Sequence, residues 1–275
     1  MSPAADKHTR MKNQPATHLF LWRGSALVIG PSLDSKLHSH FAMQLTFGLD
    51  QAFRVRLSED DRWIDTKAAI FAPNQDHQVD CGGRLAHLFV ELPLRGRGDL
   101  STLDAGYDRL PAFEVVRKSL SDINTDGLDL EAAEDAVRVW LECAFSVNSA
   151  NLARPDFDPR IAQTLDWIAT RDNGQISGDE LAARVHLSPS RFTHLFRQQT
   201  GLPLTRYLLW TRLLVAVEAV AEGANTTAAA HMAGFADLAH MSRTFRNTFG
   251  VMPSELQKMT IAFKRKSGEM TTMKA

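Results

Sequence analysis

The stretch Asp179–Gly201, DELAARVHLSPSRFTHLFRQQTG, decides the fold of the last third of the chain, because a second stretch repeats its pattern. Residues Thr227–Gly250 read TAAAHMAGFADLAHMSRTFRNTFG, and the final glycines coincide when Phe196 is superposed on Phe245. Each stretch predicts a short helix, a tight turn and a second helix with polar residues along one flank, which is the pattern of a helix-turn-helix motif. Two such motifs in tandem predict a protein that binds DNA sequence-specifically.

The turns of the two motifs differ in one residue. Gly234 stands at the turn of the second motif, where the lack of a Cβ permits a positive φ. His186 takes this place in the first motif, and histidine tolerates the left-handed region better than most residues do. We therefore expect some strain at His186. The second helices should begin near Ser188 and Asp237, which are good N-cap residues.

One helix is expected to connect the motifs. Residues 204–222 contain few helix-breaking residues and predict a continuous helix. At about 1.5 Å per residue this helix is roughly 28 Å long, close to the roughly 34 Å that separates successive major grooves on one side of a duplex. The sequence therefore predicts that one protomer contacts two successive major grooves.

Length, charge and cysteine content limit the class of protein. The 275 residues suffice for two domains. The net charge of −1 combines an acidic first half (residues 1–155, 17 Lys+Arg and 21 Asp+Glu) with a basic second half (14 and 11), which agrees weakly with DNA binding by the second half. The two cysteines, the polar N-terminus and the absence of a long apolar run favour a cytoplasmic protein without membrane spans.

The N-terminal half has a different pattern. From His18 to Leu92, short β-rich runs alternate with turn residues and predict an antiparallel sandwich or barrel. Helical periodicity follows at residues 112–120 and 129–147. An apolar stripe runs along the second of these helices and can pack either on the barrel or on a second subunit; its members are Leu130, Ala133, Val137, Trp140, Leu141 and Ala144.

Domain boundaries follow from these changes of pattern. The segment SANLARPDFDP, ending at Pro159, is typical of a linker. We expect a sensor and dimerisation domain over residues 1–150, with residues 1–14 disordered, and a linker over residues 151–158. A helical DNA-binding domain should follow over residues 159–258, and residues 259–275 should be a solvated, disordered tail. The fold class is thus α+β with two domains.

The region from Pro159 to about Gln257 resembles the DNA-binding domain of the AraC/XylS family of bacterial transcription regulators. SPSRFTHLFRQQTG matches the first recognition helix of that family, and GFADLAHMSRTFRNTFGVMPSEL matches its signature at the second. The resemblance carries the family's base contacts to Ser190, Thr193, His194, Leu238, Ala239, Ser242 and Arg243, and the exposed flanks add Arg191, Arg197 and Arg246. Leu238 and Ala239 depart from the polar residues often found there, so hydrogen-bonded readout by the second motif would rest mainly on Ser242 and Arg243.

The resemblance also implies the rest of the architecture. The family's sensor half is a cupin-like β-barrel followed by helices, and its members respond to a small-molecule effector. The expected partners are promoter DNA, RNA polymerase and a second copy of the chain. The resemblance favours activation over repression, although the residues themselves do not decide the sign.

Three histidines of the N-terminal half predict a ligand site. His38 and His40 should share one face of a strand with Gln44, and His77 follows a strand break. The set resembles the metal-binding motifs of cupins, with Gln44 where those proteins usually have glutamate. Three neutral imidazoles can hold Zn²⁺ or another divalent ion. The same side chains can instead line an effector pocket without metal or serve only the core, and His87 is a weaker candidate.

Two functions compete at this stage. The first is a non-enzymatic, ligand-responsive regulator of transcription that binds DNA through both motifs. The second is a metal-dependent cupin enzyme, such as a dioxygenase, whose helical motifs serve assembly. Gln44 in place of a carboxylate and the full length of the DNA-binding resemblance favour the regulator.

Overall fold

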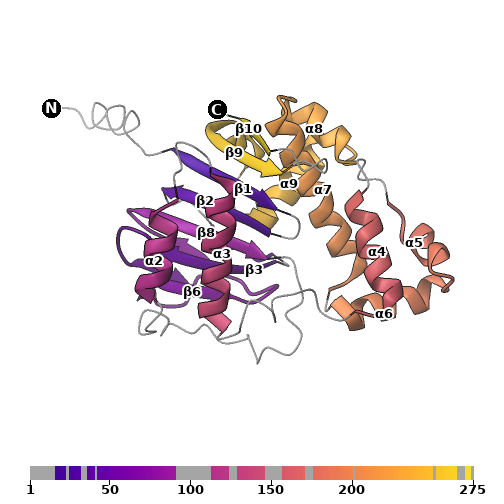
Figure 1. Ribbon diagram of the computed structural model, residues 1–275, viewed down its shortest axis with the longest axis horizontal. Coiled ribbons are helices and arrows are strands. Elements are labelled where there is room, and N and C mark those ends of the chain that lie inside the picture. Colours follow the sequence, from indigo (N-terminus) through magenta and orange to yellow (C-terminus); the bar gives the residue numbers. More distant parts are fainter. Residues whose placement is uncertain are drawn as a thin grey trace.

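A computed structural model shows a β-sheet domain beside a helical domain (Figure 1). It describes residues 16–22, 25–31, 36–40, 42–90, 113–123, 129–145, 157–170, 176–200, 202–249, 252–264 and 270–273. The expected disordered residues 1–14 and nearly all of the expected linker lie outside these ranges. In this described part of the chain, no helix is both long and apolar enough to cross a membrane.

A seven-stranded sheet and a three-stranded sheet are built mainly from residues 17–90, where the sequence predicts an antiparallel sandwich or barrel; two strands of the large sheet come from residues 259–264 and 270–273. The large sheet has the order β10-β9-β1-β2-β8-β3-β6 and the small one β5-β4-β7. The neighbours pair antiparallel except β1 and β9, which are parallel. The strands are β1 (Thr17–Trp22), β2 (Ser25–Pro31), β3 (Met43–Gly48), β4 (Phe53–Arg56), β5 (Ile64–Thr66), β6 (Ala68–Phe71), β7 (Gln78–Asp80), β8 (Arg84–Val90), β9 (Met259–Lys264) and β10 (Met270–Met273).

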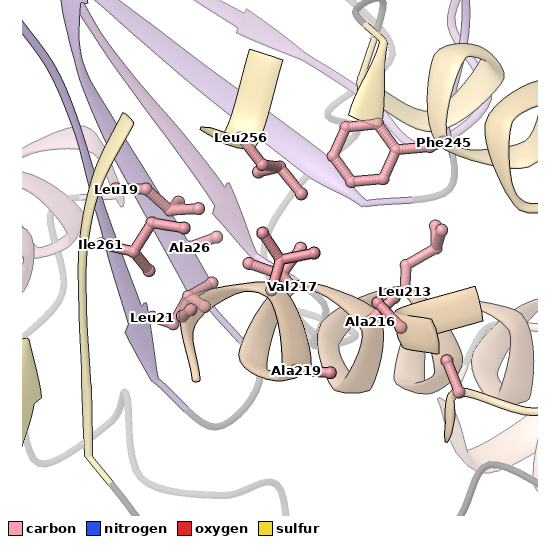
Figure 2. Close-up of a cluster of buried hydrophobic side chains, with 14 of the residues drawn as sticks. Leu19, Leu21, Ala26, Leu213, Ala216, Val217, Ala219, Phe245, Leu256 and Ile261 are labelled. Atoms are coloured by element: carbon pink, nitrogen blue, oxygen red, sulfur yellow. The ribbon is translucent and has the colours of Figure 1, made fainter. Parts of the chain in front are cut away.

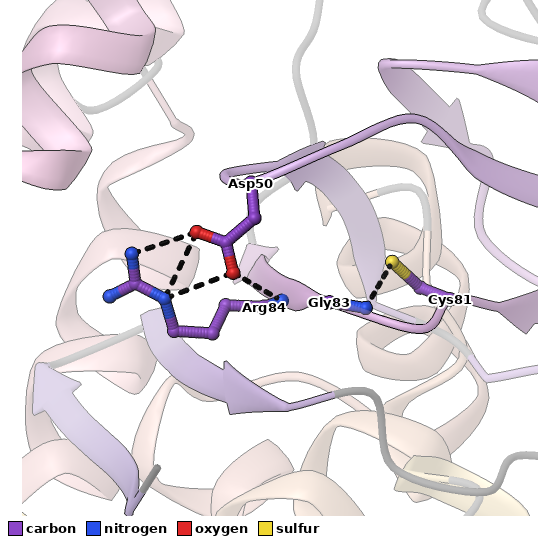
Figure 3. Close-up of polar contacts among 4 residues, drawn as sticks. All are labelled: Asp50, Cys81, Gly83 and Arg84. Atoms are coloured by element: carbon purple, nitrogen blue, oxygen red, sulfur yellow. Dashed lines mark hydrogen bonds and ion pairs between the residues drawn. The ribbon is translucent and has the colours of Figure 1, made fainter.

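A small apolar core joins the two sheets, and an ion pair joins a residue just after β3 to the start of β8. Phe53 and Val55 of β4 pack with Phe71 of β6 and Leu85 of β8. Just after β3, the carboxylate of Asp50 accepts hydrogen bonds from the backbone N–H and the guanidinium of Arg84 at the start of β8, with an Nη2–Oδ1 distance of 2.8 Å (Figure 3). These contacts fix the turn that precedes β8.

Helices α2 (Phe113–Ser121) and α3 (Leu130–Phe145) cover one face of the large sheet (Figure 1). The rings of Phe113 and Trp140 lie 4.6 Å and 5.8 Å from the ring of Phe47 on β3, measured between centroids. The apolar stripe predicted on the second helix therefore packs on the sheet of its own chain, and all six of its members belong to this core.

The helical domain contains both predicted motifs. Its elements are α4 (Pro159–Thr170), α5 (Gly178–Arg184), α6 (Pro189–Thr200), α7 (Leu204–Ala221), α8 (Thr226–Met232), α9 (Leu238–Phe249) and the 3₁₀-helix η4 (Pro253–Lys258). The pairs α5–α6 and α8–α9 are the two helix-turn-helix units, and α7 connects them. Its 18 residues correspond to a length of about 27 Å.

The two units are packed differently. Helices α4, α5 and α6 share a core with the start of α7, and this core is made of residues 157–208. The second unit packs on the sheet face opposite α2 and α3 (Figure 2): Val217 of α7 and Phe245 of α9 lie in one cluster with Leu19 and Leu21 of β1. The second unit and the sheet therefore share a hydrophobic core.

The expectation of a disordered tail is wrong for residues 259–264 and 270–273. These residues form β9 and β10 at one edge of the large sheet. The side chains of Met259, Ile261 and Phe263 are buried between sheet and helices. The alternation in MTIAF, just before the charged residues KRK, is typical of a strand.

Candidate functional site

The turns of the two motifs have the predicted backbone conformation. His186 has a φ of 54° and Gly234 a φ of 75°, so the two units use a left-handed residue at the same place. After each turn, a backbone N–H donates a hydrogen bond to a carbonyl of the first helix: Leu187 N donates to Ala182 O, and Phe235 N donates to Ala230 O. The predicted equivalence of the motifs is thereby confirmed at the level of the backbone.

The second helix of each motif begins at the predicted cap. The carboxylate of Asp237 accepts a hydrogen bond from His240 N at 2.6 Å, and Ser188 Oγ accepts a longer one from Arg191 N at 3.4 Å. Behind these caps, Phe192 and Phe196 of α6 and Met241 and Phe245 of α9 are buried in their respective cores. The burial of one flank leaves the opposite flank of each helix to solvent.

That outer flank carries the residues predicted to contact DNA. In α6, Ser190, Arg191, Thr193, His194 and Arg197 are all exposed. The Thr193 hydroxyl donates to the backbone oxygen atoms of Pro189 and Ser190 at 3.0 and 3.1 Å, so its own oxygen stays available as an acceptor.

The outer flank of α9 is less uniform. Ala239, Arg243 and Arg246 are exposed, whereas Leu238 and Ser242 are half-buried. Leu238 packs on the edge of the core that the second unit shares with the sheet. Within the described ranges, no carboxylate pairs with Arg243 or Arg246, so both guanidinium groups can meet a phosphate or a base.

A cluster of histidines lies in the N-terminal domain, close to the interface between sheet and helices. His38, His40 and His77 each offer a ring nitrogen, and these atoms lie within 4.8 Å of one another. The prediction that His38 and His40 share a strand is wrong: they lie in the irregular segment before β3, where His38 and His77 form an isolated bridge. Two backbone hydrogen bonds form this bridge: His38 N donates to His77 O (3.1 Å) and His77 N donates to His38 O (2.9 Å). They keep the two imidazole rings close together.

The backbone fixes the tautomer of all three rings. The Nδ1 atoms of His38, His40 and His77 lie 2.8, 2.8 and 2.9 Å from the backbone oxygens of Lys36, Ala42 and Gln75. Because a carbonyl oxygen only accepts, each Nδ1 must carry the hydrogen and donate it. The lone pair of each neutral ring is then on Nε2, which is the arrangement found in metal-binding histidines.

Gln44 of β3 completes this cluster. Its Oε1 lies 2.8 Å from His40 Nε2 and 3.2 Å from His77 Nε2, while its Nε2 donates to Thr46 Oγ1 at 2.9 Å. In the first two contacts the Gln44 oxygen faces ring nitrogens that carry lone pairs, so no hydrogen bond can form. A cation bound between the oxygen and the two nitrogens removes this repulsion. A 180° turn of the amide also removes it, because the Gln44 NH₂ group then donates to both rings.

Burial keeps the rings neutral. It lowers the pKa of His40 to about 4 and the pKa of His77 well below its usual value, and the neighbouring imidazoles lower both further. Burial also lowers the pKa of His38 and, to about 4, that of His87. Neutral imidazole is the form that binds a metal ion.

Sequence reasoning underestimated His87 and missed Thr46. The pairing of β3 with β8 places the two residues opposite each other, and Thr46 Oγ1 lies 3.0 Å from His87 Nδ1. Gln44 Nε2 is 3.2 Å from the same nitrogen. The polar residues at alternate positions of MQLTFG were the available signal, because alternate residues of a strand share a face.

An apolar pocket adjoins the cluster and lies between the two domains. Its walls are apolar side chains of the sheet, such as Leu19 and Phe89, and of α7 and α9, such as Val217 and Phe249. His38, Gln44 and His87 form its polar end. Its volume is about 60 Å³, which is room for roughly five water molecules, so a larger ligand requires the walls to move.

Comparison with known proteins supports the C-terminal assignment. A helix-turn-helix domain model matches residues 181–259. The transcriptional activator RhaS of Yersinia pestis bv. Antiqua (strain Angola) is 30% identical over 122 residues, which are 44% of this chain and 42% of RhaS. The transcriptional activator RhrA of Rhizobium meliloti (strain 1021) is 34% identical over 93 residues, 33% of this chain and 29% of RhrA. The chain thus spans less than half the length of these curated relatives.

The whole fold also has a solved counterpart. A crystal structure of an apo ToxT variant from Vibrio cholerae matches over 86% of this chain and 98% of its own, with a TM-score of 0.52. At 12% identity this likeness concerns the fold alone, a β-sheet domain followed by helical motifs. The two curated relatives are named as transcriptional activators. The C-terminal part of this chain is therefore similar to the helix-turn-helix region of these transcriptional activators.

Proposed function

We propose that this protein is a cytoplasmic, sequence-specific regulator of transcription that places α6 and α9 in two successive major grooves of promoter DNA. The observation that carries the proposal is the pair of equivalent helices whose polar flanks are exposed while their phenylalanines are buried. The length of α7, about 27 Å, supports adjacent grooves, since it approaches the roughly 34 Å between them. By the names of its relatives, activation through RNA polymerase is the favoured outcome.

In vitro selection from random duplexes with the full-length protein tests this function. The expected product is DNA with two short conserved boxes whose centres lie about one helical turn, roughly 10 base pairs, apart. Footprinting on that DNA should show two protected segments on one side of the duplex. Recovery of no preferred sequence would contradict the proposal.

Two arginines of α9 allow a base contact to be distinguished from a phosphate contact. Arg243 occupies a position that reads a base in related domains, and Arg246 lies one turn further along the exposed flank. We expect Arg243→Ala to lower the preference for the second box by about 1–3 kcal/mol, because a base contact is lost. Arg246→Ala should weaken binding to specific and random DNA equally, because it removes a phosphate contact. Equal losses by both variants on both DNAs would refute this sorting.

The effector site proposed for the N-terminal domain comprises the histidine cluster and the adjoining pocket. We propose that His38, His40, His77 and Gln44 bind a divalent ion of the Zn²⁺ class. The three anchored Nδ1 atoms support it, because they leave the Nε2 lone pairs available to a cation. The ligand nitrogens lie up to 4.8 Å apart, against about 3.3 Å around a tetrahedral zinc ion, so the loops must close slightly on binding.

Metal analysis without an affinity tag tests the metal part of the proposal. We expect one equivalent of Zn²⁺ per chain and a rise in melting temperature when Zn²⁺ is added to protein treated with EDTA. His77→Ala should abolish both effects, whereas His194→Ala, which changes an exposed histidine of α6, should leave them intact. If no metal binds, the pocket remains the candidate site for an apolar effector whose polar group meets Gln44 and His87.

A further inference from the structure

The last described part of the chain completes the sheet of the N-terminal domain. Strand β9 runs parallel to β1, with pairs from Thr17 and Met259 to Leu21 and Phe263. Its side chains are buried on both faces: Ile261 and Phe263 pack in the core shared with the helical domain, and Ala262 packs in the core under α2 and α3. The strand is thus an integral part of the sensor sheet rather than an adhering tail.

Strand β9 is also joined directly to the second DNA-binding unit. Helix η4 ends at Lys258 and β9 begins at Met259, and Leu256 of η4 is buried in the same core as Phe245 of α9. No residue separates η4 from the strand, and η4 shares its core with α9. A movement of α9 that carries η4 with it therefore pulls on β9.

The first unit has no comparable attachment in the described structure. Its core, from Phe157 to Leu208, contains no residue of the sheet domain. The core of the second unit includes Leu19, Leu21 and Phe89, and the ring of Phe89 lies 5.5 Å from that of Phe249. The position of α6 is therefore set within the helical domain, whereas the position of α9 is set by the sheet.

We propose that β9 is a strap that holds the second helix-turn-helix unit on the sensor domain in a restrained position, and that its release frees α9 to adjust to a groove. The inference rests on the proposed DNA-binding function. A recognition helix reads bases only within a narrow range of positions in the groove, and here the apolar core of another domain fixes that position. The pocket in this same interface leaves the docked state incompletely packed, which favours a contact that can open.

A reversible disulfide tests the strap in the full-length chain. His18 and Thr260 are paired across β1 and β9, so His18→Cys with Thr260→Cys locks the strap when oxidised. Cys81→Ser and Cys143→Ser provide a background without other thiols. The probes are the selected two-box DNA and a duplex that keeps only the box of the first motif. We expect the oxidised form to bind two-box DNA at least tenfold more weakly than the reduced form, with equal binding to the one-box duplex.

Controls separate this outcome from trivial ones. The single variant His18→Cys in the same background should show no effect of oxidation. Ala262→Asp, which places a charge in the core under α2 and α3, should tighten binding to two-box DNA and leave one-box binding unchanged. Equal or tighter two-box binding by the oxidised form, or weaker two-box binding by Ala262→Asp with one-box binding intact, overturns the strap. Failure of the DNA-binding function itself would be recognised earlier, because selection would yield no preferred sequence.

Discussion

At the scale of single residues, the left-handed positions His186 and Gly234 form a natural comparison. Both have positive φ values at equivalent turns. We expect Gly234→Ala to lower the free energy of unfolding by about 1–2 kcal/mol, because an added Cβ is strained in this region. His186→Ala should cost less than half as much, since histidine already bears most of that strain. Chemical denaturation of both variants measures the difference, and equal costs would contradict the explanation.

The buried histidines predict a dependence of stability on pH. In the folded protein the pKa of His40 is lowered from 6.5 to about 4. Between these pH values the unfolded chain binds a proton at His40 and the folded chain does not. The free energy of unfolding is therefore highest above pH 6.5 and decreases as the pH falls towards 4. For His40 alone the loss amounts to about 3 kcal/mol.

Urea titrations of EDTA-treated protein at pH 7 and pH 5 check this expectation. The wild-type chain should be less stable at pH 5, and His40→Gln should show a smaller difference between the two pH values. An identical pH dependence in His40→Gln and wild type would rule out this origin of the effect.

At the scale of elements, the caps of the recognition helices differ in strength. Asp237 accepts at 2.6 Å from His240 N, whereas Ser188 accepts at 3.4 Å from Arg191 N. An aspartate at a helix start also interacts favourably with the helix dipole. We expect Asp237→Ala to destabilise the protein by about 1 kcal/mol and Ser188→Ala by clearly less, as measured by thermal unfolding. The reverse order would show that packing rather than capping fixes these helix starts.

Elements with a local signal could be predicted from the sequence. The two motifs and α7 follow from repeated spacing, caps and a glycine at a turn, and β1 to β4, β6 and β8 follow from apolar alternation. Strands β5 and β7 have only three residues each, too few to show a period. Strand β9 was missed although MTIAF alternates, because its partner, β1, lies about 240 residues earlier in the chain and the local sequence does not indicate this pairing.

The candidate sites also divide into features with a local sequence signal and features that depend on strand pairing. The exposed flanks of α6 and α9 were predictable, because a helical period alone assigns each residue to a face. The histidine cluster was predicted in membership but for an incorrect reason: the irregular segment before β3, rather than a strand, orients His38 and His40. The role of His87 depends on the register of β3 with β8, which sequence alone does not determine.

At the scale of the whole molecule, substitution of the aligned residues Phe196 and Phe245 should destabilise different parts of the protein. Phe196 lies in the separate core of the first unit, and Phe245 lies in the core that includes the sheet. We expect Phe196→Ala and Phe245→Ala each to cost about 3–5 kcal/mol. Hydrogen exchange should show faster opening of β1 and β2 only in Phe245→Ala. Faster exchange of these strands in both variants would mean that the units are not mechanically distinct.

The parallel pairing of β1 with β9 has a consequence for biosynthesis. Strand β1 is made early, but its neighbour emerges only after about 240 further residues, which at roughly 5–20 residues per second takes about 12 to 50 seconds. Throughout that interval the nascent β-sheet domain exposes an incomplete sheet edge, a template for unwanted pairing. Chaperone occupancy on the ribosome should therefore persist until β9 has emerged.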